Sequence, residues 1–342
     1  MNLKTALELI KGGRLRLLWS VTSLFAPFYR LSFVASAAAC GLLETLAKEP
    51  RSFEALAEDF APDPSSHAGL RAWLDLGVRL GELAERPDGY RLAGYLSRKL
   101  ADPANDDVAA LVQEVVTFHH RLIVESPKRL KDARPWTLTE HDGTLIARSS
   151  RIMEPFIFQI IDWSLPTNAT RLLEVGCGAG TYLRYAAQQN IELRAVGVEM
   201  DSTVAASTAR AIAEWGLAER ITIESGDVRQ RATDASFDVV TLYNVIYYFP
   251  VAERVALFAK LASFLQPGGR LIVSTSCQGG SPGMQMLDVW TSSAEGLGRL
   301  PTEEELGNQL REAGFVDVQS KKAIPGEPYF AFVAIKPFHT RL

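Results

Sequence analysis

The stretch of sequence that decides the fold is Leu172-Leu173-Glu174-Val175-Gly176-Cys177-Gly178-Ala179-Gly180-Thr181. Its short apolar run predicts a strand that is covered on both faces of a sheet. The three alternate glycines allow the backbone to turn and to pass close to a ligand. Residues 182–189 are predicted to form a helix whose N-terminal amides face the same ligand. Glu174 stands at the end of the strand, so the stretch predicts a nucleotide-type site.

The spacing of the glycines separates two kinds of nucleotide site. A dinucleotide-binding turn has the pattern G-x-G-x-x-G or G-x-G-x-x-A, but the sixth residue counted from Gly176 is Thr181. The pattern present is E-x-G-x-G-x-G, which resembles motif I of the class I S-adenosylmethionine-dependent methyltransferases. This resemblance implies S-adenosylmethionine as the cofactor, bound by Glu174, Gly176, Gly178 and Gly180.

Strands and helices alternate after Ala169, which is typical of an α/β fold with a doubly wound parallel sheet. We expect strands at 171–175, 193–199, 221–225, 239–243 and 270–276, and helices at about 181–189, 202–215 and 251–265. Thr302 and Glu305 have capping-box spacing and are predicted to start a last helix. Two strands, 316–324 and 329–336, would follow as a reversed pair. This matches the Rossmann-like methyltransferase sheet, whose last strand is antiparallel.

Further candidate cofactor residues follow the next strands. Glu199 lies about 20 residues after the glycines, where an acid can accept hydrogen bonds from both ribose hydroxyls, and Met200 comes next. The resemblance implies that Asp227 takes the adenine amino group, that Val228 packs on the adenine ring and that Asn244 lies near the sulfonium. Their joint order indicates a methyltransferase domain.

Three regions are expected in the chain: a helical and winged-helix dimerisation domain at 1–103, a helical connector and lid at 104–165, and the cofactor-binding domain at 166–342. The first 46 residues are predicted to form two helices, the second starting at Leu31. A helix capped by Ser52, a second helix near Ser66 and a hairpin that turns at Pro87-Asp88-Gly89 predict a winged helix.

A winged helix can bind DNA, or it can form a dimer and cover the substrate, as at the front of the plant-type O-methyltransferases that this layout resembles. Residues 1–100 hold 13 Lys and Arg against 11 Asp and Glu, which is a poor electrostatic footprint for DNA. We therefore expect no nucleic-acid partner and a homodimer formed by the N-terminal helices. A DNA-binding regulator that senses S-adenosylmethionine is the non-enzymatic alternative.

Composition limits the classes of protein to which the chain can belong. The chain has 342 residues and a net charge of −4, which does not suggest a polyanion-binding protein. Its three cysteines are far apart and lack CxxC spacing, which favours a reducing cytoplasm and no metal site. Residues 17–28 are apolar, but Pro27 and Arg30 interrupt the run before about 20 residues are reached. We therefore expect no stable membrane insertion.

The residues expected at the methyl-acceptor site differ from those of the plant-type O-methyltransferases. Plant-type O-methyltransferases carry a catalytic base histidine just after the fourth strand, in a stretch such as N-V-L-H-D-W. Here Tyr247 stands at that position and Tyr248 follows it. A tyrosine with an ordinary pKa of about 10 is a poor base at neutral pH. Either another residue is the base, with His120 and His141 as candidates for O-methylation of a hydroxylated metabolite, or the acceptor needs no base.

A thioether needs no base, because its sulfur attacks directly. The leading prediction is S-methylation of a carboxylate-bearing thioether of the methylthio-hydroxybutyrate type, since the layout is similar to that of bacterial enzymes that make the precursor of dimethylsulfoniopropionate. The faces of Tyr247 and Tyr248 would stabilise the developing cation. Arg148 or Arg151 would hold the carboxylate.

The segment 279–284 contains three glycines and is predicted to be a flexible loop near the acceptor pocket. Gln278, Met284 and Trp290 are expected to line that pocket. The sequence does not identify the acceptor, nor whether sulfur, oxygen, nitrogen or carbon receives the methyl group.

Overall fold

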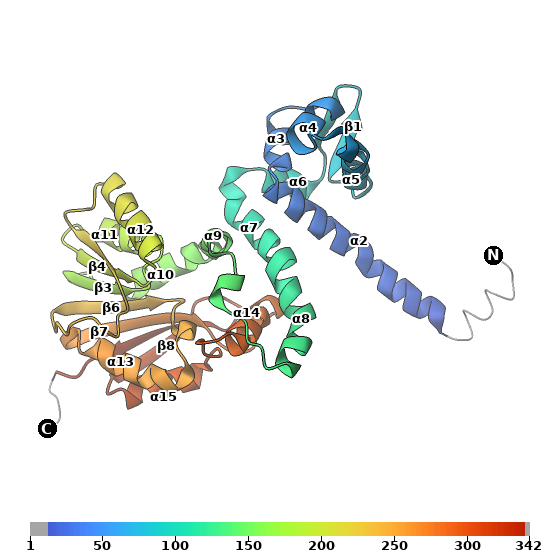
Figure 1. Ribbon diagram of the computed structural model, residues 1–342. Coiled ribbons are helices and arrows are strands. Elements are labelled where there is room, and N and C mark those ends of the chain that lie inside the picture. The colour runs from blue at the N-terminus through green and yellow to red at the C-terminus, as the bar shows by residue number, and fades with distance from the viewer. Residues whose placement is uncertain (1–12, 339–342) are drawn as a thin grey trace. The chain divides into compact units, whose positions relative to one another are not determined.

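The computed structural model describes residues 13–338, which divide into two compact units (Figure 1). The smaller unit comprises the described residues up to His120 together with Asp142–Ile152. The larger unit comprises Arg121–His141 and the described residues from Met153 onward. The division therefore runs through the region that the sequence treats as one connector, 104–165.

The larger unit is built on a seven-stranded sheet with the order β5-β4-β3-β6-β7-β9-β8. The strands are β3 (Arg171–Val175), β4 (Arg194–Glu199), β5 (Ile221–Ser225), β6 (Phe237–Tyr243), β7 (Leu265–Ser276), β8 (Val316–Lys322) and β9 (Tyr329–Ile335). Strands β3 to β7 pair in parallel, whereas β9 runs antiparallel to both β7 and β8. The predicted doubly wound sheet with an antiparallel last strand is confirmed.

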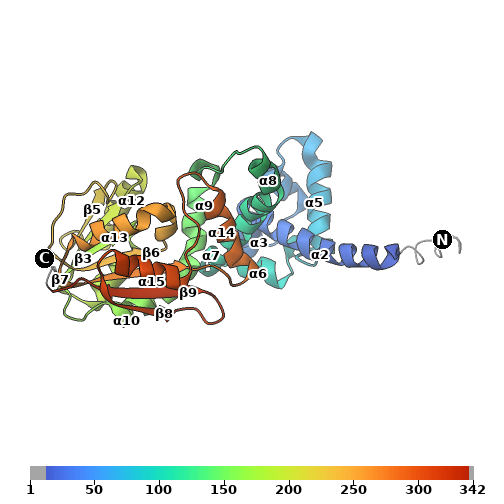
Figure 2. The ribbon, with the colours of Figure 1, turned by 90° about the horizontal axis from the view of Figure 1, so that it is seen from below.

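Helices cover both faces of this sheet, and Figure 1 shows the two layers. One face carries α10 (Glu154–Ser164), α11 (Thr181–Gln189) and α12 (Ser202–Glu214), and the other carries α13 (Arg254–Ala262) and α15 (Glu303–Glu312). In Figure 2, α15 lies against β8 and β9, which it contacts. Successive side chains of a strand point to opposite faces, so Leu172 belongs to one apolar core and Leu173 to the other.

One helix of the larger unit was not predicted. The segment expected to be a flexible loop gives way at Pro282 to α14 (Pro282–Ser293). Proline is favoured in the first turn of a helix, because backbone N–H groups there have no partner within the helix and the lack of one costs no hydrogen bond. Gly279 and Gly280 precede this helix with positive φ angles and make the turn that was expected. Thr302 and Glu305 do form the predicted capping box at the start of α15.

The smaller unit begins with α2 (Arg14–Ala39), which runs through Pro27 without a break and is followed by α3 (Leu42–Lys48). The predicted start of a second helix at Leu31 is therefore wrong. A proline inside a helix removes one N–H bond and crowds the carbonyl four residues earlier. The C-terminal half of α2 offsets this cost by burial, since Phe33 and Val34 lie in the core of the unit.

The predicted winged-helix order is present in the smaller unit. It consists of α4 (Phe53–Phe60), α5 (His67–Arg79), β1 (Leu83–Arg86), β2 (Gly89–Leu92) and then α6 (Tyr95–Leu100). The Ser52 side chain accepts a hydrogen bond from the amide of Ala55, as expected of a helix N-cap. On α5, Arg71 donates hydrogen bonds to Glu85 and to the hydroxyl of Tyr90 within the unit.

The region that the sequence predicts as a helical connector is divided into several helices. α7 (Asp106–Glu114) continues through a π-helical turn, Val115–His119, into α8 (His120–Lys131), which runs through Pro127. α9 (Gly143–Ser149), a 3-10 turn and α10 follow along the chain.

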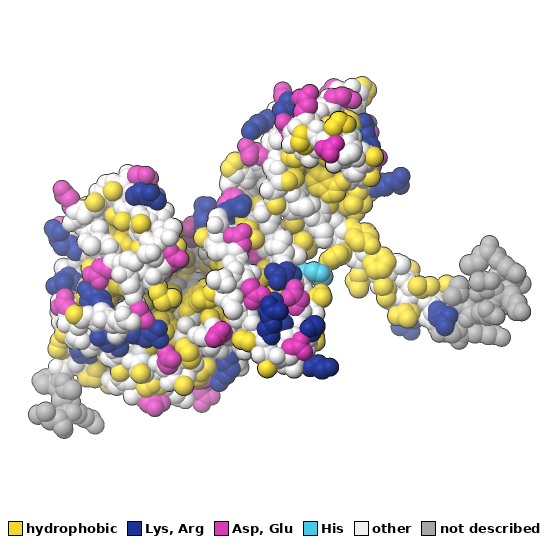
Figure 3. Space-filling model, viewed as in Figure 1, with side chains coloured by type: hydrophobic (Ala, Val, Ile, Leu, Met, Phe, Trp, Pro, Cys, Tyr) yellow, Lys and Arg dark blue, Asp and Glu magenta, His cyan; other side chains and the backbone are white. Residues whose placement is uncertain are grey.

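The N-terminal half of α2 exposes large apolar side chains, which Figure 3 shows along the helix. The most exposed are Leu17, Leu18, Trp19, Leu24 and Phe28. Among the described residues, α2 is the one helix whose length and hydropathy would suit a membrane span. This is weak evidence for a span, because an apolar helix that packs within a soluble protein meets the same criteria.

Candidate active site

The glycine turn joins β3 to α11 at the point where the strand order reverses between β3 and β6. Ligands of doubly wound sheets bind at such switch points. Gly176 has a φ of +67°, and a Cβ atom there would lie 2.7 Å from the side chain of Val245. Gly180 has a φ of +75°, and its Cβ would lie 2.8 Å from the methyl group of Thr208. Both dihedral angle and space therefore require glycine at these positions.

Glu199, at the end of β4, faces the turn. Its Oε2 accepts a hydrogen bond from the amide of Gly178 at 3.0 Å, and its Oε1 accepts one from the amide of Asp201 at 3.1 Å. These two bonds hold the carboxylate beside the glycines, which suits the predicted contact with the ribose hydroxyls. That contact stays a prediction.

Glu174 of β3 has a buried carboxyl group. It is 2% exposed, and it pairs in register with Thr241 of β6. Within residues 13–338, neither Glu174 Oε1 nor Thr241 Oγ1 has a hydrogen-bond partner. Burial raises the pKa of Glu174 well above its usual range. A buried carboxyl of this kind requires a partner, and the ammonium group of S-adenosylmethionine fits this need.

The residues predicted to hold the adenine lie at the end of β5 and beyond. Asp227 accepts hydrogen bonds from the backbone and the guanidinium of Arg229, with a closest side-chain distance of 2.7 Å. The guanidinium holds the pKa of this carboxyl below its usual range. Val228 is buried, whereas Met200 is exposed. The adenine contacts remain predictions, and no group of His, Cys, Asp or Glu in the described residues could hold a metal ion.

Asn244 follows β6 and has a left-handed backbone, with a φ of +58°. Its backbone N–H donates a hydrogen bond to the backbone carbonyl of Ser274 at 2.8 Å. Its side-chain Oδ1 accepts a hydrogen bond from the hydroxyl of Tyr329 at 2.9 Å, and this hydroxyl lies 3.0 Å from Ser274 Oγ. The sequence reading missed Tyr329, since a residue of the last strand gives no local sign of contact with position 244.

Tyr247 and Tyr248 lie in a short 3-10 turn after β6, with their ring centroids 5.0 Å apart. The ring of Tyr248 meets Trp290 of α14 edge-on at 6.1 Å. The ring centroid of Trp290 also lies 5.0 Å from that of His141. Four aromatic rings of the larger unit therefore form one cluster, which contains one of the two histidines proposed as bases. His120 belongs to the smaller unit, where its ring lies 5.9 Å from that of Phe28.

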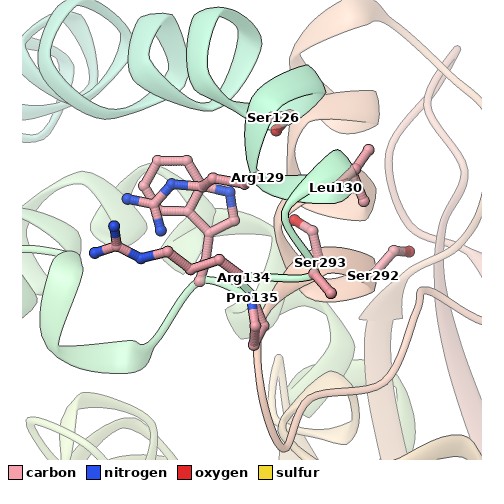
Figure 4. A pocket seen from close by; sticks show the side chains of 9 residues that line it. Ser126, Arg129, Leu130, Arg134, Pro135, Ser292 and Ser293 are labelled. Atoms are coloured by element: carbon pink, nitrogen blue, oxygen red, sulfur yellow. The ribbon is translucent and has the colours of Figure 1, made fainter.

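The segment that carries His141 is fixed to the end of α14. Trp136 donates its backbone N–H to the carbonyl of Ser293 at 3.0 Å and accepts a bond from the amide of Glu295 at 2.8 Å. The guanidinium of Arg129 lies 3.6 Å from the centre of the Trp136 ring. Both side chains line a hollow of about 280 Å³, and Figure 4 shows Arg129 and Ser293 among its lining residues.

The predicted substrate residues are divided between the two units. In the smaller unit, Arg148 forms a two-bond ion pair with Asp106, with nitrogen–oxygen distances of 2.5 and 3.1 Å. Arg151 lies 3.9 Å from the same carboxylate. Gln278 lies in the larger unit, where its backbone amide donates to the carbonyl of Pro301. A substrate carboxylate at Arg148 would compete with Asp106, so this role stays a prediction.

Comparison with known proteins gives the family. The chain matches the family described as methyltransferase domain over residues 48–320. It is 28% identical to demethylspheroidene O-methyltransferase of Rhodobacter capsulatus over 232 residues, which are 67% of this chain and 55% of that protein. The chain spans about half the length of the curated relatives it matches, 55% and 46% for the first two.

Solved structures share the fold over almost the whole chain. Mitomycin 7-O-methyltransferase has a TM-score of 0.78 at 19% identity, covering 95% of this chain and 99% of that one. Human N-acetylserotonin methyltransferase in complex with S-adenosylmethionine has a TM-score of 0.72 at 18% identity, covering 94% and 98%. The family match covers more than half of the chain and includes the glycine turn. The chain therefore belongs to the S-adenosylmethionine-dependent methyltransferases.

Proposed function

We propose that the protein transfers a methyl group from S-adenosylmethionine to a hydroxyl oxygen of a small, largely apolar natural product. The observation that carries this proposal is the aromatic cluster of the larger unit, in which His141 contacts Trp290 and Trp290 contacts Tyr248. It combines an apolar surface for a flat acceptor with a side chain that can accept a proton.

The similarity to proteins that are named as O-methyltransferases supports oxygen as the acceptor atom. Sulfur, which the sequence reading ranked first, has weaker support. Of its two predicted carboxylate anchors, Arg148 is already paired with Asp106, and Arg151 lies 3.9 Å from the same carboxylate. O-methylation of a hydroxylated metabolite, which is the alternative in the sequence prediction, is therefore the main proposal.

The chain's own residues have separate tasks in this reaction. Glu174, Glu199, Asp227 and the glycine turn would hold S-adenosylmethionine, which supplies a methyl group already activated by its sulfonium. The aromatic rings would orient the acceptor and exclude water. His141 would take the hydroxyl proton as a general base. Of the two histidines, it is the one that lies in the aromatic cluster.

An acceptor screen tests the proposal. The purified protein is incubated with S-adenosylmethionine and a panel of planar phenols, hydroxylated polyenes and carboxylate-bearing thioethers, and products are identified by mass spectrometry. We expect O-methylated products and the release of S-adenosylhomocysteine. A methylated thioether without any O-methylated product would contradict the proposal. The variant Arg148→Gln is the matched check, because it should leave O-methylation unchanged, whereas a reaction that needs Arg148 as a carboxylate anchor would be lost.

The exposed apolar side of α2 also suits an interface between two copies of the chain. Isolated exposed apolar side chains are normal, but a continuous set marks an interaction surface. In the plant-type O-methyltransferases that this chain resembles, the N-terminal helices commonly form a dimer, and we propose the same for α2.

A further inference from the structure

The side chain of Asn244 is held in one orientation by residues that take no part in the proposed chemistry. Its backbone lies in the left-handed region, which a non-glycine residue seldom adopts and which asparagine tolerates best. The hydrogen bond from its backbone N–H to the carbonyl of Ser274 in β7 maintains this conformation. The side chain thus projects from the carboxyl end of β6, next to the glycine turn that follows β3.

Tyr329 determines which half of the Asn244 side-chain amide remains available to a ligand. This tyrosine is completely buried, and its hydroxyl donates to Asn244 Oδ1 at 2.9 Å. Because the hydroxyl proton is used in this bond, Ser274 Oγ donates to the tyrosine oxygen across 3.0 Å. The carbonyl half of the Asn244 amide therefore faces the protein interior. The NH₂ half, with two N–H donors, is what Asn244 offers to a ligand.

We propose that the NH₂ group of Asn244 donates a hydrogen bond to the acceptor oxygen that is methylated, and that this oxygen reacts as the oxyanion of a phenol or an enol. The inference rests on the proposed O-methylation. A donor of this kind favours an anionic oxygen and gives no advantage to a thioether sulfur or to a protonated amine. Phenols and enols ionise at far lower pH than alcohols, so one neutral donor and one histidine suffice for them. Tyr329 and Ser274 are positioning residues.

Atoms and charge are conserved in the proposed methyl transfer. The hydroxyl proton moves to a ring nitrogen of His141, and the oxygen keeps the bonding pair as an oxyanion. That pair forms the new O–C bond while the S–C bond breaks, and the pair of the broken bond goes to sulfur. The protonated His141 then releases its proton to solvent. Asn244 keeps its protons throughout and stabilises the oxyanion before attack.

The variant Asn244→Asp tests the donor directly. It keeps the shape of the side chain and an oxygen for the Tyr329 hydroxyl, and it replaces only NH₂ by a carboxylate oxygen. We expect kcat/KM for a phenol to fall about 10- to 100-fold, the range for loss of a hydrogen bond to a charged group. The affinity for S-adenosylhomocysteine, measured by calorimetry, should stay within a factor of about 3, since the lost contact is with the acceptor. Asn244→Gly, which tolerates the same backbone conformation, should show the same loss.

The variant Tyr329→Phe tests the positioning role. It should lower kcat more than it raises KM, and its effect should vanish in the background of Asn244→Gly, because the two residues act as one unit. Tyr185→Phe is the matched control, since Tyr185 donates to the exposed carboxylate of Asp162 in the same unit. It should leave kcat/KM unchanged.

Two results would overturn the inference in distinguishable ways. If Asn244→Asp weakens S-adenosylhomocysteine binding by the same factor as kcat/KM, or retains full kcat/KM on phenols, the amide does not serve the acceptor, while O-methylation stands. If the wild-type protein methylates only sulfur or nitrogen acceptors, the proposed function fails together with the inference.

Discussion

The carboxylate of Glu199 and the amide of Gly178 are joined by a hydrogen bond of 3.0 Å, which links the end of β4 to the glycine turn after β3. The same carboxylate is the predicted partner of the ribose. We expect Glu199→Gln to weaken S-adenosylhomocysteine binding about 10-fold or more, because a charged acceptor of two hydrogen bonds is replaced by a neutral one. Calorimetric titration measures this. Glu214→Gln, at the exposed end of α12, is the matched control and should bind normally. Equal affinities would remove Glu199 from the cofactor site.

The buried carboxyl of Glu174 predicts a dependence of stability on pH. Its pKa is raised by burial, so above the usual carboxyl range the folded protein binds more protons than the unfolded chain. The free energy of unfolding without ligand should therefore fall as the pH rises from about 4.5 toward the raised pKa. Glu174→Gln should weaken this dependence. Thermal unfolding at a series of pH values measures it, and an unchanged dependence in the variant would contradict the assignment.

The same carboxyl predicts that cofactor binding releases a proton. An ammonium group beside Glu174 would favour the ionised form and lower its pKa on binding. Calorimetry of S-adenosylhomocysteine in buffers of different ionisation enthalpy should show proton release for the wild type and none for Glu174→Gln. Wild-type binding that releases no proton would contradict this prediction.

The parts of the fold that could be predicted from the sequence are those with local signals. The strand before the glycine turn is a continuous apolar run, and Gly176 and Gly180 need the backbone conformation that only glycine adopts readily. The capping box of Thr302 and Glu305 is equally local. In each case, neighbouring residues along the chain contain the physical cause of the structure.

The errors have physical causes that lie elsewhere in the chain. α2 continues through Pro27 because burial of residues such as Phe33 stabilises a helix that proline alone would weaken. The contact of Tyr329 with Asn244 joins residues 85 positions apart and follows from strand order, which local patterns do not contain. The contact of His141 with Trp290 likewise joins distant parts of the chain, and the segment around Trp136 is bonded to the end of α14.

The two histidines proposed as bases can be separated by a matched pair of variants. We expect His141→Gln to lower kcat about 10²- to 10⁴-fold, the usual contribution of a general base, with little change in S-adenosylhomocysteine affinity. His120→Gln should retain most of the activity, since His120 lies in the smaller unit. A strong loss in His120→Gln alone would reverse the assignment.

The apolar surface of α2 gives the last prediction. Trp19 is 73% exposed and Leu24 is 67% exposed. If a second copy covers them, the double variant Trp19→Glu and Leu24→Glu should convert a dimer into a monomer, because two charges would be buried without partners. Light scattering coupled to size-exclusion chromatography measures the mass. Ile191→Glu, a change at a residue of the larger unit that is 74% exposed, is the matched control and should leave the dimer intact. A wild-type protein that is monomeric and binds to lipid vesicles through α2 would show instead that this helix contacts a membrane surface, and the dimer proposal would be wrong.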